Sequence, residues 1–244
     1  MKKIWSLLLI TLVASLAFST HAKNMEVKTT LRGVLTVAVT DLPNQEIPTM
    51  TWTNEFFQAF AMENGLVVHY VTVPFDKAWE LAAKGQVDVV ATGVSALPER
   101  KIKGAKWSKP YLEETRALRI HAKDTSRFKT IKDFVGHRVG VLSGTTSELD
   151  LRNRAPSGVD IVLVKHRTEL YELFNQGKVD AIAEGIYVTA KKAAPADTLV
   201  IDTHDFVSGQ KEELVFVVYE GDHDLLDELN EFLTTKGFPL NKTP

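Results

Sequence analysis

Two segments of the sequence repeat one another in the same order. Residues 85–93 (GQVDVVATG) match residues 177–185 (GKVDAIAEG), 92 residues further on, and residues 33–40 (GVLTVAVT) resemble residues 136–143 (GHRVGVLS), 103 residues further on. Any α/β protein can repeat a glycine followed by an apolar strand once. Two matches in one order with similar offsets favour a duplicated unit. We therefore expect two similar lobes.

Strand and helix patterns alternate along both halves. Apolar runs predict strands, and apolar positions three and four residues apart predict a helix with Phe56, Phe57 and Phe60 on one face. The expected strands are Val34–Val39, Val67–Val73 and Val87–Ala91, and the expected helices are Thr53–Asn64, Asp76–Lys84 and Thr168–Gln176. This alternation predicts parallel sheets with helical crossovers, an α/β fold.

The first 22 residues are typical of a secretory signal peptide. Lys2 and Lys3 precede an apolar run, Ile4–Phe18, and Thr20 and Ala22 supply the small residues before a cleavage site. The alternative is a membrane anchor, but the run is shorter than the roughly 20 residues that span a bilayer. We expect cleavage after Ala22. The chain has no cysteine for a disulfide or a lipid, so the periplasm is the expected location.

Composition narrows the function classes. The chain has 244 residues, 44% hydrophobic and 25% charged, with a formal net charge of −2. This near-neutral balance indicates neither nucleic acid nor an anionic membrane as a partner. The seven histidines show no metal-ligand spacing, and we find no nucleophile, P-loop or dinucleotide motif. We expect no metal and no cofactor.

The repeat also places a candidate site. Ligands of parallel α/β sheets bind beyond the carboxyl ends of the strands. Thr92 and Gly93 end the repeated strand in one half, and Glu184 and Gly185 end its counterpart. If the lobes face one another, these four residues lie across a cleft.

Three further features are compatible with a small anionic ligand. Arg100 follows a proline-led turn, and its guanidinium suits a carboxylate, although most arginines are merely solvated. Thr145 and Thr146 open an expected helix running to about Arg154, where free N–H groups attract anions, although simple capping is common. Phe75 could stack on a ligand, whereas Trp79 is expected in the core.

The order and spacing of several short blocks resemble the family 3 periplasmic solute-binding proteins, which serve amino-acid ABC transporters. The likeness runs from Gly33 to about Leu233, and its most specific part is the stretch from Thr92 to Arg100 followed by Trp107–Tyr111. The other matching blocks are Val39–Pro43, Val71–Asp76, Gly85–Asp88, Val139–Thr146 and Gly221–Leu226.

The resemblance implies roles for individual residues. Arg100 matches the family's arginine that binds the ligand α-carboxylate, and Thr145 and Thr146 match a turn that donates to the same group. Groups near Gly93 and Ser95 complete the polar ring, and Phe75 packs on the ligand.

One departure concerns the ligand ammonium group. The family usually places an aspartate where this chain has Gly185. Glu184, one residue earlier, points to the other face of a strand and could replace it only if the strand has ended there. The segments 51–55 and 44–47 also depart from the family pattern. A carboxylate that is not an amino acid therefore stays open as the ligand.

The resemblance implies a two-lobed, type II periplasmic binding protein-like fold, each lobe a mixed, mostly parallel sheet flanked by helices. We expect lobe 1 to comprise residues 23–112 plus 210–244 and lobe 2 residues 113–209, with hinge crossings near 113–116 and 206–210. The expected function is capture of an amino acid or other carboxylate by hinge closure, as a monomer, for an ABC permease. The alternatives are a cyclohexadienyl dehydratase-like enzyme using Glu184 as general acid, and a stand-alone ligand sensor.

Overall fold

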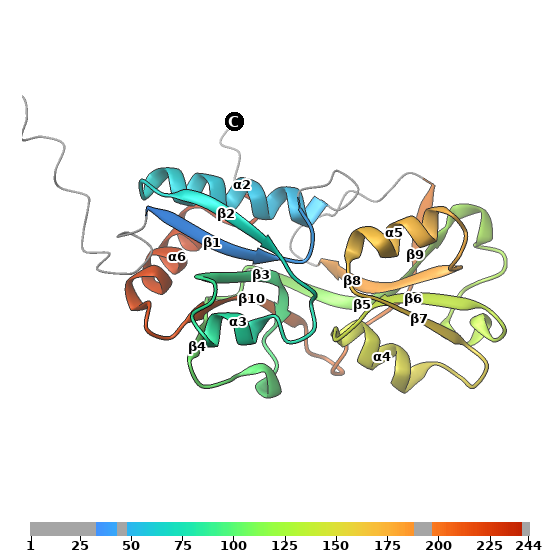
Figure 1. Cartoon of the computed structure of the whole chain (residues 1–244). Helices are drawn as coiled ribbons and strands as arrows, with labels where there is room; N and C mark the ends of the chain where they lie inside the picture. Colours follow the sequence, from blue (N-terminus) through green and yellow to red (C-terminus); the bar gives the residue numbers. More distant parts are fainter. Residues whose placement is uncertain (1–32, 43–47, 188–196, 241–244) are drawn as a thin grey trace, which may run out of the picture.

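In a computed structural model, residues 33–42, 48–187 and 197–240 are described, and they form two α/β lobes that lie side by side along one sheet (Figure 1). The strand order is β2-β1-β3-β10-β5-β8-β6-β7, with β4 paired to β10 and β9 paired to β5. The expected signal peptide lies outside the described residues, and so does the departing segment 44–47.

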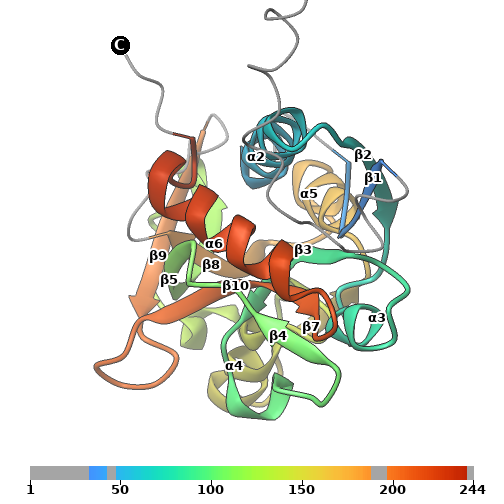
Figure 2. The same ribbon diagram turned by 90° about the vertical axis from the view of Figure 1, so that its left-hand side faces the viewer.

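The first lobe is built from β1 (Val34–Val39), β2 (Val67–Thr72), β3 (Val89–Ser95), β4 (Ala105–Trp107) and β10 (Glu212–Tyr219). Its helices are α2 (Pro48–Glu63), α3 (Trp79–Ala83) and α6 (His223–Lys236), with a 3-10 turn at Pro98–Arg100. Figure 2 shows α6 and α2 on one side of this lobe and α3 on the other. The apolar positions foreseen on the first helix, Phe56, Phe57 and Phe60, are all buried against β1, β3 and α6.

The second lobe contains β6 (Arg138–Leu142), β7 (Asp160–Val164), β8 (Ala181–Tyr187) and β9 (Thr198–His204). Helix α4 (Thr146–Arg154) covers one face and α5 (Arg167–Asn175) the other (Figure 1). Two short 3-10 turns, Ala122–Asp124 and Ile131–Phe134, precede β6. Phe128, Phe134 and Leu151 fill the core under α4, and Leu170 and Phe174 fill the core under α5.

The repeat seen in the sequence is a repeat of topology. In the first lobe β1 pairs in parallel with both β2 and β3, and in the second lobe β6 pairs in parallel with both β7 and β8. Each lobe therefore has the same β-α-β-α-β order, with the first strand in the middle. The repeated V-D motif immediately precedes β3 in one lobe and β8 in the other, and both strands follow a short helix.

The two lobes are joined by β5 (Leu112–His121), which belongs to both. Its start, Leu112–Glu114, pairs antiparallel with β10, and Glu114–Ile120 pairs antiparallel with β8. The chain returns to the first lobe between β9 and β10, through residues 205–211. The described residues contain no helix long and apolar enough to cross a bilayer.

Candidate functional site

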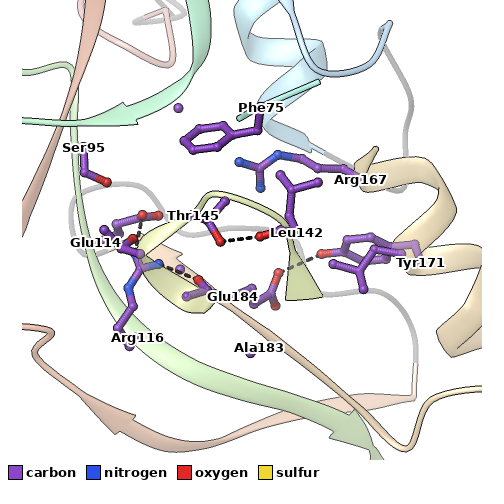
Figure 3. Close-up of a pocket in the computed structure, with 15 residues that line it drawn as sticks. Phe75, Ser95, Glu114, Arg116, Leu142, Thr145, Arg167, Tyr171, Ala183 and Glu184 are labelled. Atoms are coloured by element: carbon purple, nitrogen blue, oxygen red, sulfur yellow. Dashed lines mark hydrogen bonds and ion pairs between the residues drawn. The ribbon is translucent and has the colours of Figure 1, made fainter. Parts of the chain in front are cut away.

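A cavity lies where the two lobes meet, at the carboxyl ends of the parallel strands (Figure 3). Gly93 and Ser95 reach it from β3, Thr145 and Thr146 from the start of α4, and Gly185 from β8. The remaining lining residues come from both lobes and from β5: Phe75, Glu114, Arg116, Leu142, Ser147, Arg167, Leu170, Tyr171, Ala183 and Glu184. The cavity thus lies at the strand ends where the repeat predicted a candidate site.

The volume of the cavity is about 30 Å³. Since a water molecule takes up roughly 30 Å³ of the liquid and its centre needs only about 10–15 Å³, this is room for water rather than for an amino acid. A larger solute needs the two lobes to separate.

The start of α4 is a polar wall of the cavity. The Thr145 hydroxyl donates to the Leu142 carbonyl at 2.6 Å and accepts from the Glu148 N–H at 3.3 Å, so it caps the helix. Gly144, with φ of 78°, makes the preceding turn, and its N–H donates to Glu148 at 2.7 Å. Because the N–H groups of a first helical turn have no partner inside the helix, this wall suits an anion.

Arg100 lies beside the cavity, outside its lining. Its guanidinium lies against two neighbouring rings, Phe75 at 5.3 Å and Trp79 at 5.1 Å, and Nη2 donates to the Gly144 carbonyl of the other lobe at 3.0 Å. The Nη1 atom is buried and has no hydrogen-bond partner among the described residues. Burial lowers the pKa of Arg100 from its usual value. A planar donor held this way is suited to a carboxylate.

Thr92 also lies beside the cavity. It is fully buried, and its carbonyl accepts from Arg167 Nη2 at 3.5 Å. Of the nine candidate site residues, the structure gathers Phe75, Gly93, Ser95, Thr145, Thr146, Glu184 and Gly185 on the lining and leaves Arg100 and Thr92 just outside it.

Glu184 could replace an acid at position 185 only if the strand had ended there, and this condition is not met. The strand does not end there, because β8 continues to Tyr187. The Glu184 carboxylate forms an ion pair with Arg119 and accepts a hydrogen bond from the Tyr171 hydroxyl at 2.9 Å. Burial alone would lower the pKa of Arg119, but this carboxylate outweighs it and the pKa is raised.

Sequence reasoning missed a charged cluster on β5. Arg116 forms ion pairs with Glu114 and, at 3.0 Å, with Glu212, and its Nη1 donates to Ser147 at 2.6 Å. Glu212 also accepts from the Ser95 hydroxyl. Burial lowers the pKa of Arg116, but the carboxylates outweigh it and the pKa is raised, whereas burial raises the pKa of Glu212. The available signal was the Glu-x-Arg spacing of Glu114 and Arg116, which puts both side chains on one face of a strand.

Arg167 was also missed. It is the first residue of α5, where a cation opposes the helix dipole. Its Nε atom is buried and has no hydrogen-bond partner in the described parts of the chain. Figure 3 shows its guanidinium pointing into the cavity towards Phe75. The available signal in the sequence was an arginine at the start of a helix, where its charge opposes the helix dipole.

The lobes also touch through Asp41, at the end of β1. Its carboxylate accepts from the backbone N–H groups of Arg167 at 2.8 Å and Thr168 at 3.2 Å, so it caps α5 from the other lobe. The Thr40 carbonyl lies 3.1 Å from His166 Nδ1. Among the described residues, no cluster of three or more His, Cys, Asp or Glu side chains could hold a metal ion.

Comparisons with known proteins agree with this architecture. The profile of the bacterial extracellular solute-binding proteins, family 3, matches residues 52–236. The histidine-binding periplasmic protein of Escherichia coli (strain K12) is 28% identical over 113 residues, 46% of this chain and 43% of that protein. The L-cystine-binding protein TcyJ of the same strain is 26% identical over 178 residues, 72% of this chain and 65% of that one. The matches thus span only part of these relatives, less than half for the histidine-binding protein.

Solved structures show the same fold. The arginine-bound, truncated ArgBP from T. maritima has a TM-score of 0.63 and 24% identity, covering 84% of this chain and 97% of that one. The ancestral amino acid-binding protein AncCDT-1, described as a precursor of cyclohexadienyl dehydratase, has a TM-score of 0.66 and 23% identity, covering 84% and 89%. At this level of identity the likeness concerns the fold alone.

Proposed function

The chain belongs to the bacterial extracellular solute-binding proteins of family 3, and on this premise we propose that it captures a small carboxylate-bearing solute between its lobes. An amino acid is the first candidate, because the curated relatives are named for histidine, arginine and cystine. The observation that carries the proposal is the cavity itself, lined by Gly93 and Ser95 of β3 in one lobe and by Gly185 of the equivalent strand, β8, in the other.

The proposed anchor for the carboxylate is Arg100 together with the start of α4. Arg100 has an unpaired buried donor, and it already touches the turn before Thr145 across the cleft. A carboxylate entering between these groups would be held by both lobes at once. Differential contact of this kind shifts an open and closed equilibrium towards the closed state.

The proposed lobe limits are residues 23–112 plus 210–244 for lobe 1 and 113–209 for lobe 2. Two features support them: β5 changes its partner from β10 to β8 at Glu114, and the return crossing runs through residues 205–211. Bending at these two places would open the cavity. A solute larger than water would enter the cavity through this movement.

The test of the anchor is calorimetry on Arg100→Ala with each amino acid that binds the unmodified protein. Removing one partner of a buried charge pair costs about 2–5 kcal/mol of binding free energy, so we expect affinity to be almost abolished. Arg100→Lys keeps the charge but loses the planar fork, and should bind with intermediate affinity. Arg127→Ala, which removes a half-exposed arginine of the second lobe, is the matched control. Unchanged affinity in Arg100→Ala would contradict the assignment.

We further propose that the protein works in the periplasm and hands its solute to an inner-membrane ABC permease. The support is the naming of its curated relatives as periplasmic binding proteins and ABC transporter components. Stimulation of the ATPase of a permease encoded beside the gene, only when the solute is present, tests delivery. A stand-alone sensor would give no such stimulation.

The enzymatic alternative requires a general acid. Glu184 was the candidate, but its ion pair with Arg119 favours the ionised carboxylate, which has no proton to give. We therefore propose binding without chemistry. Incubation with cyclic carboxylates would contradict this if a product formed that was lost in Glu184→Gln.

A further inference from the structure

Two acidic residues share one arginine beside the cavity. Glu114 of β5 and Glu212 of β10 are directly opposite each other in the sheet, and Arg116 lies two residues along β5 on the same face. Like charges placed opposite one another repel, and Arg116 relieves this by pairing with both. The two carboxylates therefore share one guanidinium.

Glu114 lines the cavity, and its two carboxylate oxygens have different neighbours. Its Oε1 atom pairs with Arg116. Its Oε2 atom lies 1.9 Å, and its carboxyl carbon 2.3 Å, from the position that a Cβ atom on residue 185 would occupy. Glu114 therefore fills the space that a side chain at 185 would need, and only glycine leaves this space free. Figure 3 shows Glu114 in the wall beside Arg116 and Thr145.

The other carboxylates near the cavity are held by the protein itself. Glu212 is bound by Arg116 and Ser95, and Glu184 by Arg119 and Tyr171. Among the described residues, the Glu114 carboxylate makes one ion pair, with Arg116. The cavity thus has an acceptor on the β5 side and donors at the start of α4.

We propose that Glu114 binds the ammonium group of the solute, supplying from β5 the acid that Gly185 cannot supply from β8. The inference rests on the proposed function and deepens it. A site with a negative group on one wall and anion-binding groups on another is complementary to a zwitterion. The solute is then an amino acid rather than a carboxylate without nitrogen.

The experiment compares paired probes on the purified protein. Each L-amino acid of a panel is titrated beside its 2-hydroxy acid, which keeps the carboxylate and lacks the ammonium group. We expect the unmodified protein to prefer the amino acid. Glu114→Gln should weaken amino-acid binding about 10- to 100-fold, the range for one hydrogen bond to a charged group, and should leave the 2-hydroxy acid unchanged.

Glu113→Gln is the matched control. It makes the same charge change one residue away, on the opposite face of β5, and should change neither affinity. Urea unfolding of each variant separates loss of binding from loss of structure. A second variant, Glu114→Ala with Gly185→Asp, returns the acid to β8 and should restore part of the amino-acid preference.

The outcomes distinguish this inference from the proposed function. Equal affinity of the unmodified protein for an amino acid and its 2-hydroxy acid would overturn the role of Glu114 while leaving solute binding in place. So would a preference that survives in a folded Glu114→Gln variant. Should Glu114→Gln fail to fold, absence of any recovered preference in the second variant overturns it. If no carboxylate binds the unmodified protein, both proposals fall.

Discussion

At the scale of single residues, the candidate site depends on a glycine, Gly185, which has no side chain. Gly185 pairs with Arg116 across the β5–β8 ladder, in the middle of a buried strand pair. Its backbone conformation is open to other residues, since its φ is not in the left-handed region. The requirement for glycine at this position is therefore one of space, and the space is taken mainly by the Glu114 carboxylate, with Arg116 Nη2 also within 2.6 Å of the Cβ position.

This leads to a prediction for Gly185→Ala. The added methyl group must displace a buried, ion-paired carboxylate, and overpacking of this kind costs about 1–3 kcal/mol of unfolding free energy. In a Glu114→Ala background the same substitution should cost much less. Urea unfolding of the four proteins in a double-mutant cycle measures the coupling, which should be at least about 0.5 kcal/mol for residues in contact. Additive effects would contradict the packing described here.

At the scale of elements, the notable arrangement is a helix capped by the other lobe. The residue before α5 is His166, whose side chain makes no capping hydrogen bond. Asp41 does this instead, accepting from two N–H groups of the first turn of α5. Since an N-cap acceptor stabilises a helix end, this contact favours the arrangement in which the lobes are together.

Asp41→Ala should therefore weaken solute binding although Asp41 does not line the cavity. Loss of an N-cap costs about 0.5–2 kcal/mol, which corresponds to roughly 2- to 30-fold in affinity if the cost falls on the closed state alone. Asp41→Asn keeps an acceptor oxygen and should lose less. Calorimetry measures the affinity, and small-angle scattering measures how far the solute compacts each variant. Full affinity in Asp41→Ala would show that the contact does not favour closure.

The elements also show what local sequence patterns can and cannot reveal. The strand Val34–Val39 was predicted with its observed limits, because an apolar run has a clear start and end. Helix α2 begins at Pro48, five residues before the predicted start, because its first turn is marked by a proline at the first helical position rather than by an apolar stripe. The lobes and the strand ends at the cavity followed from the repeat.

The missed residues are those whose role depends on distant partners. Arg116 meets Ser147, 31 residues away, and Glu212, almost a hundred residues away. Arg167 meets Thr92 through a contact 75 residues apart in the chain. Nothing in a local window shows which charged side chain will face which. Only the sheet order, with β10, β5 and β8 adjacent, brings these groups together.

At the scale of the whole molecule, the lobes share a strand. β5 pairs with β10 of the first lobe and with β8 and β9 of the second. Apolar packing also crosses the boundary, since Met50 and Phe75 of the first lobe belong to the same buried cluster as Leu142 and Leu170 of the second. Loss of β5 from either lobe would leave its partner strands in the other lobe unpaired.

We therefore expect calorimetric unfolding in one transition. A solute that binds only the folded protein should raise its stability, by about 2.7 kcal/mol at a free concentration one hundred times the dissociation constant. Differential scanning calorimetry with increasing concentrations of a binding amino acid measures the shift. Two separate transitions, of which only one moves with the solute, would contradict the coupling of the lobes through β5.

The position of Glu114 has a consequence for how the solute specificity of such a protein can change during evolution. In the sheet register Glu114 stands opposite Glu212 on one side and Tyr187 on the other, at the point where β5 passes from one lobe to the next. If Glu114 binds the solute as proposed, a mutation that changes its charge also changes the place where β5 passes between the lobes. Selection for a different solute at Glu114 would therefore also act on the connection between the two lobes.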